Sequence, residues 1–428
     1  MRLKAPSIAL LAAALVACGG TKPVELSPAS SNIKHLVVIV QENHTFDNHF
    51  GRYCKAAPGS NPACTAGPTC CEAAPDKEPS GAAPLALTDT EMGGWDPNHT
   101  SECETDEIDG GKMDKFVTST FCGSPRNFAV ATDVVMPYWN YAGQYAIADR
   151  FFQSVVGQTS ANDMFLARAG FVFKDNDYGP GGQTARCGVA TKNMQWTDPT
   201  IGDLLVAQGA TWAWYSEGYK AMVDSITNDN RCPDPPDDCG AHQPFYPCTY
   251  DPSDVPFMYY KPFLDNPQYM RDYLGLVVDL VGGTLPQVSF VKPIGYHTEH
   301  PGAKTKLSDG VKFATTVAEA VMSSQYGSDT LVLLAYDEGG GYFDHVPPPT
   351  TVAADGKPNG TRVPFMALGP FAKKNYVSHV QMEHSSIVKF IEWNWLGGKT
   401  GQLGTRDTTV NNIGDLLDPA MTGTAVPQ

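Results

Sequence analysis

The sequence predicts an α/β fold in which helices flank a central, mostly parallel sheet. Residues 33–40 and 330–335 form unbroken apolar runs, which are typical of strands buried on both faces of a parallel sheet. Strand-like and helix-like segments alternate along the chain, and this alternation favours helices on both faces of one sheet. Cysteines are concentrated in the part of the chain before residue 249, which indicates disulfide-rich loop insertions.

The segments between the two apolar runs fit the same architecture. Gly209 can end a helix expected over residues 201–208. Ser308 can cap another helix, which Gly327 can end. The other expected elements are helices over residues 137–148, 161–169 and 385–395 and strands over residues 211–215, 287–291 and 363–368.

The N-terminus has the pattern of an export signal with a lipid-attachment site. Residues 5–17 are almost entirely apolar but shorter than the roughly 20 residues that a membrane-spanning helix needs. The sequence Leu-Val-Ala-Cys resembles a lipobox, so we expect cleavage before Cys18 and lipid attachment to it. An ordinary secretory signal is the alternative. The expected divisions are a signal peptide over 1–17, a tether over 18–31 and a single domain over 32–428 with insertions near 53–90 and 228–256.

These features predict an exported protein that is lipid-anchored to the cell envelope, in the outer membrane or periplasm. The chain has 11 cysteines, and setting Cys18 aside leaves an even number, which predicts up to five disulfides in an oxidising compartment. Metal binding by these cysteines is the alternative, but the chain has no CxxC pair. The formal net charge of −16 would repel nucleic acid, so no nucleic-acid partner is expected.

Acidic residues follow both of the buried apolar runs. Glu42 and Asn43 come after the first run, and Asp337 and Glu338 come after the second. In open α/β sheets, ligands bind beyond the carboxyl ends of the strands, and buried acidic pairs need a positive partner. Carboxylate and amide oxygens are hard ligands, so one divalent ion such as Mg²⁺, Mn²⁺ or Ca²⁺ would supply that charge. The alternative is that these residues only form turns.

Candidate nucleophiles and proton donors lie in other segments. Residues 157–162 lead into an expected helix, and a hydroxyl of Thr159 or Ser160 would lie where a helix N-terminus favours an anion. An ordinary helix cap is the alternative. Histidine can protonate a leaving oxygen or contact charged phosphate oxygens. The histidines in a context suited to this chemistry are His99, His300 and His345.

Two long motifs closely resemble those of a known family. Residues 41–51 (QENHTFDNHFG) and 336–347 (YDEGGGYFDHVP) are similar to motifs of the phosphoesterase family of phospholipases C and bacterial acid phosphatases. Shorter blocks match in the same order, so the resemblance covers most of residues 33–396. These blocks lie at His99 and at residues 109–117, 157–162, 299–301, 362–365 and 384–387.

The resemblance implies a fold like that of alkaline phosphatase and a metal-dependent hydrolysis of phosphoric esters. It implies that Thr159 attacks phosphorus to form a phospho-enzyme. It also implies that His99 and His300 contact phosphate oxygens or protonate the leaving alcohol. Asn162 in the nucleophile turn and His345 are implied as further candidates for substrate binding. The implied ligands of the divalent metal are Glu42, Asn43, Thr159, Asp337 and Glu338.

The sequence leaves the substrate open. Gln158 and Ala161 stand where the family's nucleophile turn usually has prolines, and Ser253 and Asp254 precede a Pro-Phe pair where histidine is common. The expected function is a phospholipase C, with an acid phosphatase acting on small phosphomonoesters as the alternative. A non-catalytic surface lipoprotein is a third hypothesis, which the intact acidic pairs disfavour.

Overall fold

The computed structural model describes residues 26–188, 190, 192–235, 239, 246–350 and 353–428. The predicted signal peptide, the predicted lipid-attachment site at Cys18 and the first part of the predicted tether lie outside these residues. Within the described part of the chain, no helix has the length and apolar character needed to span a membrane.

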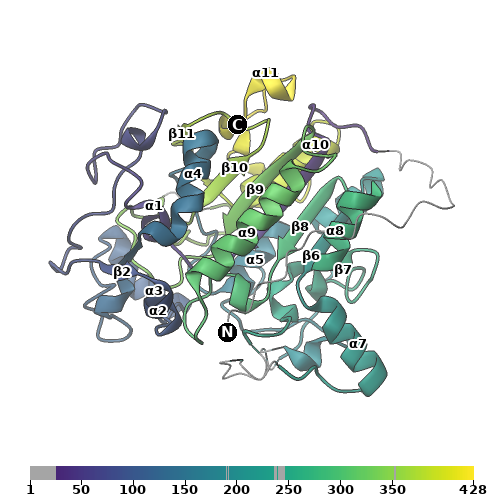
Figure 1. Cartoon of the computed structure of the whole chain (residues 1–428), viewed down its shortest axis with the longest axis horizontal. Coiled ribbons are helices and arrows are strands. Elements are labelled where there is room, and N and C mark those ends of the chain that lie inside the picture. The colour runs from purple at the N-terminus through teal and green to yellow at the C-terminus, as the bar shows by residue number, and fades with distance from the viewer. Residues whose placement is uncertain (1–25, 189, 191, 236–238, 240–245, 351–352) are drawn as a thin grey trace, which may run out of the picture.

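An eight-stranded sheet forms the centre of the fold (Figure 1). Its strands are, in spatial order, β11 (Tyr376–Ser378), β4 (Ala146–Ala148), β10 (Phe365–Leu368), β9 (Thr330–Tyr336), β1 (His35–Gln41), β8 (Val288–Lys292), β6 (Trp212–Ser216) and β7 (Met270–Asp272). The pairings in this sheet are parallel except those of β10, which is antiparallel to β9 and β4. The predicted central, mostly parallel sheet is therefore confirmed.

Helices cover both faces of the sheet, as predicted. The helices in front of it in Figure 1 are α4 (Met136–Gln144) and α9 (Leu307–Met322), and those behind it are α5 (Thr159–Arg168) and α10 (His384–Trp395). α6 (Ile201–Gln208) packs against α5 and α10. Because both faces are covered, every residue of β1 and of β9 is buried. This burial explains why the two strands are continuous apolar runs instead of alternating ones.

The other elements lie around this three-layer centre. β2 (Leu85–Leu87) pairs with β3 (Ala129–Ala131), and β5 (Phe151–Phe152) pairs with β12 (Met382–Glu383). The remaining α-helices are α1 (Phe46–Phe50), α2 (Asp89–Gly93), α3 (Ser101–Ile108), α7 (Tyr219–Asp229), α8 (Tyr273–Gly282) and α11 (Pro419–Thr422).

One predicted helix is partly wrong. The helix expected over residues 137–148 ends at Gln144, and the segment Ala146–Ala148 forms β4. Alanine favours helix, but β4 is inserted between β10 and β11, and this pairing outweighs the local preference. The helix predicted over residues 201–208 is confirmed as α6.

The helix expected to be capped by Ser308 also differs in detail. α9 begins one residue earlier, at Leu307, and its last residue, Met322, precedes Gly327 by several positions. The Ser308 hydroxyl donates to Oδ2 of Asp89 at 2.7 Å, so this side chain joins α9 to α2 instead of capping α9.

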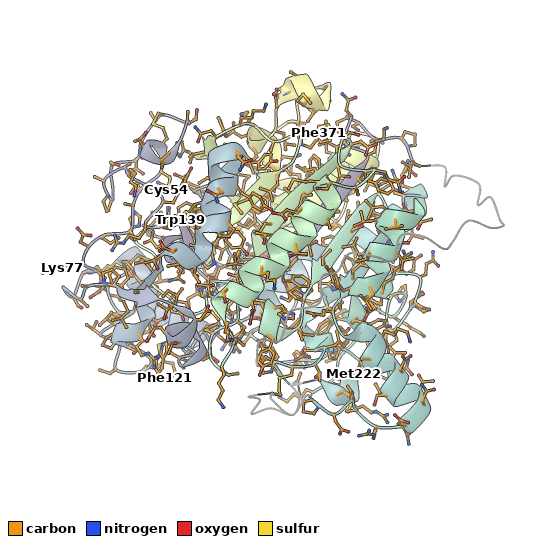
Figure 2. All side chains as sticks on the ribbon, viewed as in Figure 1. Cys54, Lys77, Phe121, Trp139, Met222 and Phe371 are labelled. Carbon is orange, nitrogen blue, oxygen red and sulfur yellow. A yellow bond between two sulfur atoms is a disulfide. The ribbon has the colours of Figure 1, made fainter. Side chains whose placement is uncertain are left out.

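Disulfides tie the irregular segments of the chain (Figure 2). The bonded pairs are Cys54–Cys71, Cys64–Cys70, Cys103–Cys122, Cys187–Cys232 and Cys239–Cys248. The prediction of up to five disulfides is therefore confirmed. Each bond limits the conformations of the unfolded chain, and such restriction typically contributes about 2–4 kcal/mol to stability.

Candidate active site

The two acidic pairs lie side by side at the carboxyl edge of the sheet. β1 and β9 are parallel neighbours in a register that places Gln41 opposite Tyr336, so the residues after both strands leave the sheet together. The backbone N–H of Asn43 donates to Oδ1 of Asp337 at 3.0 Å. Segments that are far apart in the sequence thereby form one buried wall. The residues of this wall are Glu42, Asn43, Asp337 and Glu338.

Gly340 permits the close approach of these two segments. Its φ is +66°, and a Cβ at this position would lie 2.3 Å from the carbonyl oxygen of Asn43. Any other residue would be strained and would push the two segments apart. The N–H of Gly340 also donates to Oε2 of Glu338 at 2.6 Å, which orients that carboxylate.

Thr159 brings a hydroxyl to the acidic wall. It is the first residue of α5, and its Oγ1 donates to Oδ1 of Asn43 at 3.3 Å. Thr159 also lines a cavity of about 360 Å³. Ser160 does not line this cavity and is only 1% exposed. Its backbone N–H donates to the side chain of Asn176. Of the two adjacent hydroxyls, the one that faces both the cavity and the acidic pairs is that of Thr159.

The turn before α5 is held by Glu104, which the sequence analysis missed. Oε2 of Glu104 accepts from the N–H of Gly157 at 2.7 Å, and Oε1 accepts from the N–H of Thr361 at 3.1 Å. Burial raises the pKa of Glu104 to about 7, although these hydrogen bonds oppose the shift. No local motif marked this glutamate, because its partners are distant in the sequence.

Asn162 was predicted to bind substrate, but the structure places it elsewhere. Its Nδ2 donates to the carbonyl of Gly157 at 2.9 Å, and its Oδ1 accepts from the N–H of Val155 at 3.0 Å. The side chain is fully buried and does not line the cavity. The Asn162 side chain thus holds the turn that carries Thr159, and substrate binding by Asn162 stays a prediction.

Lys292 is the buried cation of the site, and the sequence analysis also missed it. It ends β8, and its Nζ lies 2.9 Å from Oε1 of Glu42 and 3.3 Å from Oδ2 of Asp163. Burial opposes its charge, but Asp163 and Glu42 hold the pKa of Lys292 well above its ordinary value. Burial also opposes the charge of Glu42, but Lys292 keeps the pKa of that carboxyl below its ordinary value. One lysine thus joins β1, β8 and α5 electrostatically.

The remaining carboxylates of the wall, Asp337 and Glu338, are less well compensated, because burial raises the pKa of both. Burial raises the pKa of Asp337 to about 6 even though Lys292 opposes the shift. Burial, with the charge of Asp337 added to it, raises the pKa of Glu338 well above its ordinary value. Oδ2 of Asp337 and Oε1 of Glu338 are buried and have no hydrogen-bond partner among the described residues. These two oxygens are hard donors that a divalent cation could satisfy.

Three groups of ionisable side chains in the described residues have ligand atoms within 4.8 Å of one another. They are Asp96–His99–His300, Cys103–Glu107–Cys122 and Asp47–Asp344–His345. The cysteines of the second group form a disulfide, and Arg362 neutralises the third. The first group lines the cavity, so it is a candidate metal-binding group there. The predicted acidic ligands do not form such a compact group, since Glu42 is turned toward Lys292.

His99 and His300 face one another in the same cavity as Thr159. Their rings meet edge to face with centroids 5.8 Å apart. Nδ1 of His99 lies 3.7 Å from Oε1 of Glu338, and burial lowers the pKa of His99. Nδ1 of His300 lies 2.7 Å from the carbonyl oxygen of Pro301, which can only accept, so this nitrogen carries a proton. The nitrogen of His300 that remains for chemistry is therefore Nε2.

The position where the family commonly has a histidine carries Ser253 and Asp254, and both line the cavity. Burial, with the charge of Glu42 added to it, raises the pKa of Asp254 well above its ordinary value. Tyr246 completes this wall, and its hydroxyl donates to Oε2 of Glu42 at 3.3 Å. The departure from the family pattern therefore lies in the wall of the cavity itself.

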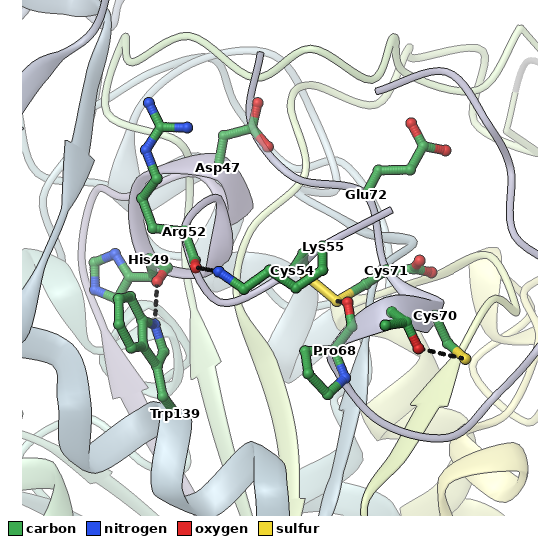
Figure 3. The surroundings of a disulfide bond; sticks show 12 residues. Asp47, His49, Arg52, Cys54, Lys55, Pro68, Cys70, Cys71, Glu72 and Trp139 are labelled. Atoms are coloured by element: carbon green, nitrogen blue, oxygen red, sulfur yellow. Dashed lines mark hydrogen bonds between the residues drawn. A yellow bond between two sulfur atoms is a disulfide. The ribbon is translucent and has the colours of Figure 1, made fainter. Parts of the chain in front are cut away.

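Substrate binding by His345 stays a prediction, and in the structure both ring nitrogens of this residue contact carboxylates. Its Nδ1 lies 2.8 Å from Oδ2 of Asp47, its Nε2 lies 3.0 Å from Oε2 of Glu72, and it does not line the cavity. Figure 3 shows Asp47 and Glu72 on the two segments that the Cys54–Cys71 disulfide ties together. His345 therefore fastens the chain after β9 to a disulfide-bonded segment.

This ion-pair network predicts a pH-dependent stability. Burial opposes the charge of His345, but Asp47 and Glu72 raise its pKa from 6.5 to about 9. A raised pKa in the folded state stabilises below pH 6.5, and the stabilisation is lost as the pH rises to about 9. We expect His345→Gln to lower the free energy of unfolding by about 3 kcal/mol at pH 6 and by much less near pH 9. Urea unfolding of both proteins across this range measures the difference, and a difference independent of pH would contradict the assignment.

A family model matches most of the chain. The Phosphoesterase family model matches residues 33–396. Similar curated proteins include the non-hemolytic phospholipase C of Pseudomonas aeruginosa, which is 24% identical over 84% of this chain and 54% of its own length. Phospholipase C B of Mycobacterium tuberculosis is 22% identical over 90% of this chain and 77% of its own length. The chain thus spans about half of the Pseudomonas relative.

Solved structures align along much of the chain at low similarity. A member of the alkaline phosphatase superfamily from Vibrio parahaemolyticus aligns over 92% of this chain and 74% of its own, with 10% identity and a TM-score of 0.39. The lipoteichoic acid synthase LtaP of Listeria monocytogenes aligns over 89% of this chain and 76% of its own, with 11% identity and a TM-score of 0.39.

Proposed function

Because the chain belongs to the Phosphoesterase family, we propose that it is a phosphoric-ester hydrolase of the phospholipase C type. The observation that carries the proposal is the position of Thr159. Its hydroxyl lies at the N-terminus of α5, 3.3 Å from Oδ1 of Asn43, within the cavity that His99 and His300 also line. A nucleophile, its acidic partners and two proton-carrying side chains are the parts that ester hydrolysis through a covalent intermediate requires.

The proposed reaction has two steps. Oγ1 of Thr159 gives its proton to solvent water and attacks phosphorus in line with the leaving oxygen, and the ester bond breaks as the Thr159–phosphate bond forms. Nε2 of His300, when protonated, gives its proton to the departing alcohol, since Nδ1 is held by Pro301. His99, whose ring lies beside that of His300, contacts the phosphate oxygens. Water then gives a proton to Nε2 of His300 and attacks phosphorus, which breaks the Thr159–phosphate bond and releases phosphate or a phosphorylated head group, and Oγ1 of Thr159 regains its proton from solvent.

We propose that the acidic wall holds one divalent ion, Mg²⁺, Mn²⁺ or Ca²⁺, and that Glu42 would then share its carboxylate between this ion and Lys292. The proposed ligands are the ones expected from the family: Glu42, Asn43, Thr159, Asp337 and Glu338. The unpartnered oxygens of Asp337 and Glu338 support this assignment. When bound, such an ion lowers the pKa of a ligated hydroxyl and offsets charge on the phosphate. Lys292 holds Glu42 in place beside it.

Removing divalent metal should therefore remove most of the activity. We expect EDTA treatment followed by desalting to lower kcat by at least about 100-fold, because the buried carboxylates would repel a phosphate ester. Adding Mg²⁺, Mn²⁺ and Ca²⁺ separately should restore activity to different degrees and identify the ion. A purified protein that contains no divalent ion by elemental analysis and keeps full activity in EDTA would contradict this part of the proposal.

The substrate is the finer part of the proposal. The curated relatives are named as phospholipases C, which favours a phospholipid. The alternative is a small phosphomonoester, as for an acid phosphatase, and both fit the same chemistry. We expect phosphatidylcholine to be hydrolysed with a higher kcat/KM than p-nitrophenyl phosphate under matched conditions. Turnover of the monoester alone would show that the protein is an acid phosphatase and not a phospholipase C. Turnover of neither substrate would favour a non-catalytic surface lipoprotein.

We also propose export and lipid attachment at Cys18. The disulfides support passage through an oxidising compartment, and the lipobox-like sequence before Cys18 supports an anchor at the membrane surface. Mass spectrometry of the N-terminal peptide from membranes would identify the lipid, and an unmodified Cys18 would contradict the anchor without affecting the proposed chemistry.

A further inference from the structure

Helix α8 exposes a continuous apolar stripe, and its opposite face is buried. Leu276 and Leu280 pack into the core. The exposed residues are Leu274, Val277, Val278 and Val281, at 65%, 43%, 67% and 81%. Their spacing of three, four and seven positions places them on one face of the helix. Isolated exposed apolar side chains are common, but a contiguous stripe of this kind marks a surface that contacts a partner or a membrane.

The position of α8 links this stripe to the N-terminus of the chain. α8 follows β7, the last strand of the sheet order, so it lies at one side of the molecule (Figure 1). Leu26, the first described residue, lines a cavity together with Asp279 of α8 and with Gly283, which ends the helix. The next residue is fixed in turn, because the N–H of Ser27 donates to Oε1 of Gln287 at 3.0 Å. The predicted tether, which begins at Cys18, therefore joins the described part of the chain beside the C-terminal end of α8.

We propose that the stripe on α8 docks the domain on a bilayer of uncharged phospholipid. The inference rests on the proposed lipid at Cys18. From Cys18 to Leu26 the chain spans eight residue steps, so an extended tether reaches at most roughly 28 Å. A lipid at Cys18 would thus hold the domain within contact range of the bilayer. An apolar helix face lying in the interface would then fix the orientation of the domain.

The charges around α8 favour zwitterionic over anionic lipid. The helix itself carries no lysine or arginine, and Arg271 beside it is paired with Asp279 at 2.8 Å. The chain as a whole has a formal net charge of −16. Attraction to an anionic surface needs clustered basic residues, which this surface lacks. Apolar contact is therefore the interaction that α8 offers, and phosphatidylcholine is the surface that it fits.

The direction in which α8 runs also determines how the active site would lie relative to the bilayer. Its N-cap, Asp272, is the last residue of β7 and lies at the carboxyl edge of the sheet, where the acidic wall is. Its other end lies at the opposite edge, beside Leu26. A domain resting on α8 would thus keep the carboxyl edge of the sheet near the membrane, while the lipid at Cys18 could stay in the same membrane.

A spin label on α8 tests the proposal directly. Val278→Cys in the exported, lipid-bearing protein provides one free thiol, because ten cysteines are disulfide-bonded and the lipid would block Cys18. Lys77→Cys is the matched control, since Lys77 is exposed and lies on the other side of the molecule from α8 (Figures 1 and 2). The measurement is collision of the nitroxide with oxygen and with a water-soluble nickel chelate on phosphatidylcholine vesicles.

We expect the collision rate with the nickel chelate to fall at least about tenfold at position 278 and not at position 77, because apolar lipid excludes the chelate. The fall should be smaller on phosphatidylglycerol vesicles. Equal exposure of both labels on vesicle-bound protein would overturn the proposal. Spin–spin broadening at 278 would show a second copy on the stripe, and an immobile label before vesicles are added would show that another segment of the chain covers it. Either result would also overturn the proposal.

Failure of this proposal is distinguishable from failure of the proposed function. The collision measurement does not need turnover, so it gives the same result in a Thr159→Ala background. A second label at Cys18, detected by mass, would show that the anchor is missing, and this too would overturn the proposal.

Discussion

Replacing Thr159 with alanine is expected to lower kcat by about 10⁴-fold or more while leaving the fold intact, because a covalent mechanism has no other nucleophile to use. Thr159 is 5% exposed, and its hydroxyl donates a long hydrogen bond, at 3.3 Å, to Asn43, so its loss should cost about 1 kcal/mol of stability. Hydrolysis of p-nitrophenyl phosphate and phosphatidylcholine measures the first quantity, and urea unfolding measures the second.

Ser160→Ala is the matched control for this variant. Ser160 is the neighbouring residue of the same helix, but it does not line the cavity, so we expect its replacement to change kcat less than about threefold. Thr159→Ser keeps a hydroxyl and should retain part of the activity. Full activity in Thr159→Ala together with loss of activity in Ser160→Ala would show that the nucleophile is Ser160 and not Thr159.

Replacing Lys292 with methionine is expected to lower the free energy of unfolding by about 3–5 kcal/mol, because it leaves buried carboxylates without their cation. Nζ lies 2.9 Å from Glu42 and 3.3 Å from Asp163, and the lysine side chain is only 2% exposed. Methionine fills a similar volume, so the loss would reflect charge more than packing. Denaturant unfolding at neutral pH, without added metal, measures the change.

The exposed ion pair between Lys34 and Asp329 supplies the control. Its Nζ–Oδ2 distance is 3.1 Å, but the side chain of Lys34 is 58% exposed, so water screens the pair. We expect Lys34→Met to cost less than about 1 kcal/mol. If Lys292→Met is as stable as Lys34→Met, the acidic wall is neutralised by some means other than Lys292.

The strands that carry the acidic wall could be predicted because their local sequence alone indicates that they are buried. The uninterrupted apolar residues of β1 and β9 indicate strands covered on both faces, and the acidic residues directly after them indicate the functional edge. β4 could not be predicted in the same way. Its three residues, Ala146–Ala148, have a weak local preference, and only the neighbouring strands β10 and β11 make them extended.

The missed residues of the site are those whose partners are distant. Lys292 ends β8, and nothing in its local sequence shows that it meets Glu42 and Asp163 in space. Glu104 supports the turn before α5 from α3 in the same way. Conversely, Asn162 and His345 lie in motifs that resemble the family's, yet each side chain is committed to structural contacts. A motif therefore indicates that a residue matters, but its role depends on the direction of its side chain.

The central claim is that Thr159 becomes phosphorylated during turnover, and rapid quenching tests it most directly. The protein would be mixed with excess phosphate ester, quenched in acid during steady-state turnover, digested and analysed by mass spectrometry. We predict that the peptide containing Thr159 gains a phosphoryl group from p-nitrophenyl phosphate or the phosphorylated head group from phosphatidylcholine, with fragmentation assigning it to Thr159, and that Thr159→Ala gains neither. Phosphorylation of Ser160 or of a histidine would contradict the claim, as would turnover without any phosphorylated peptide.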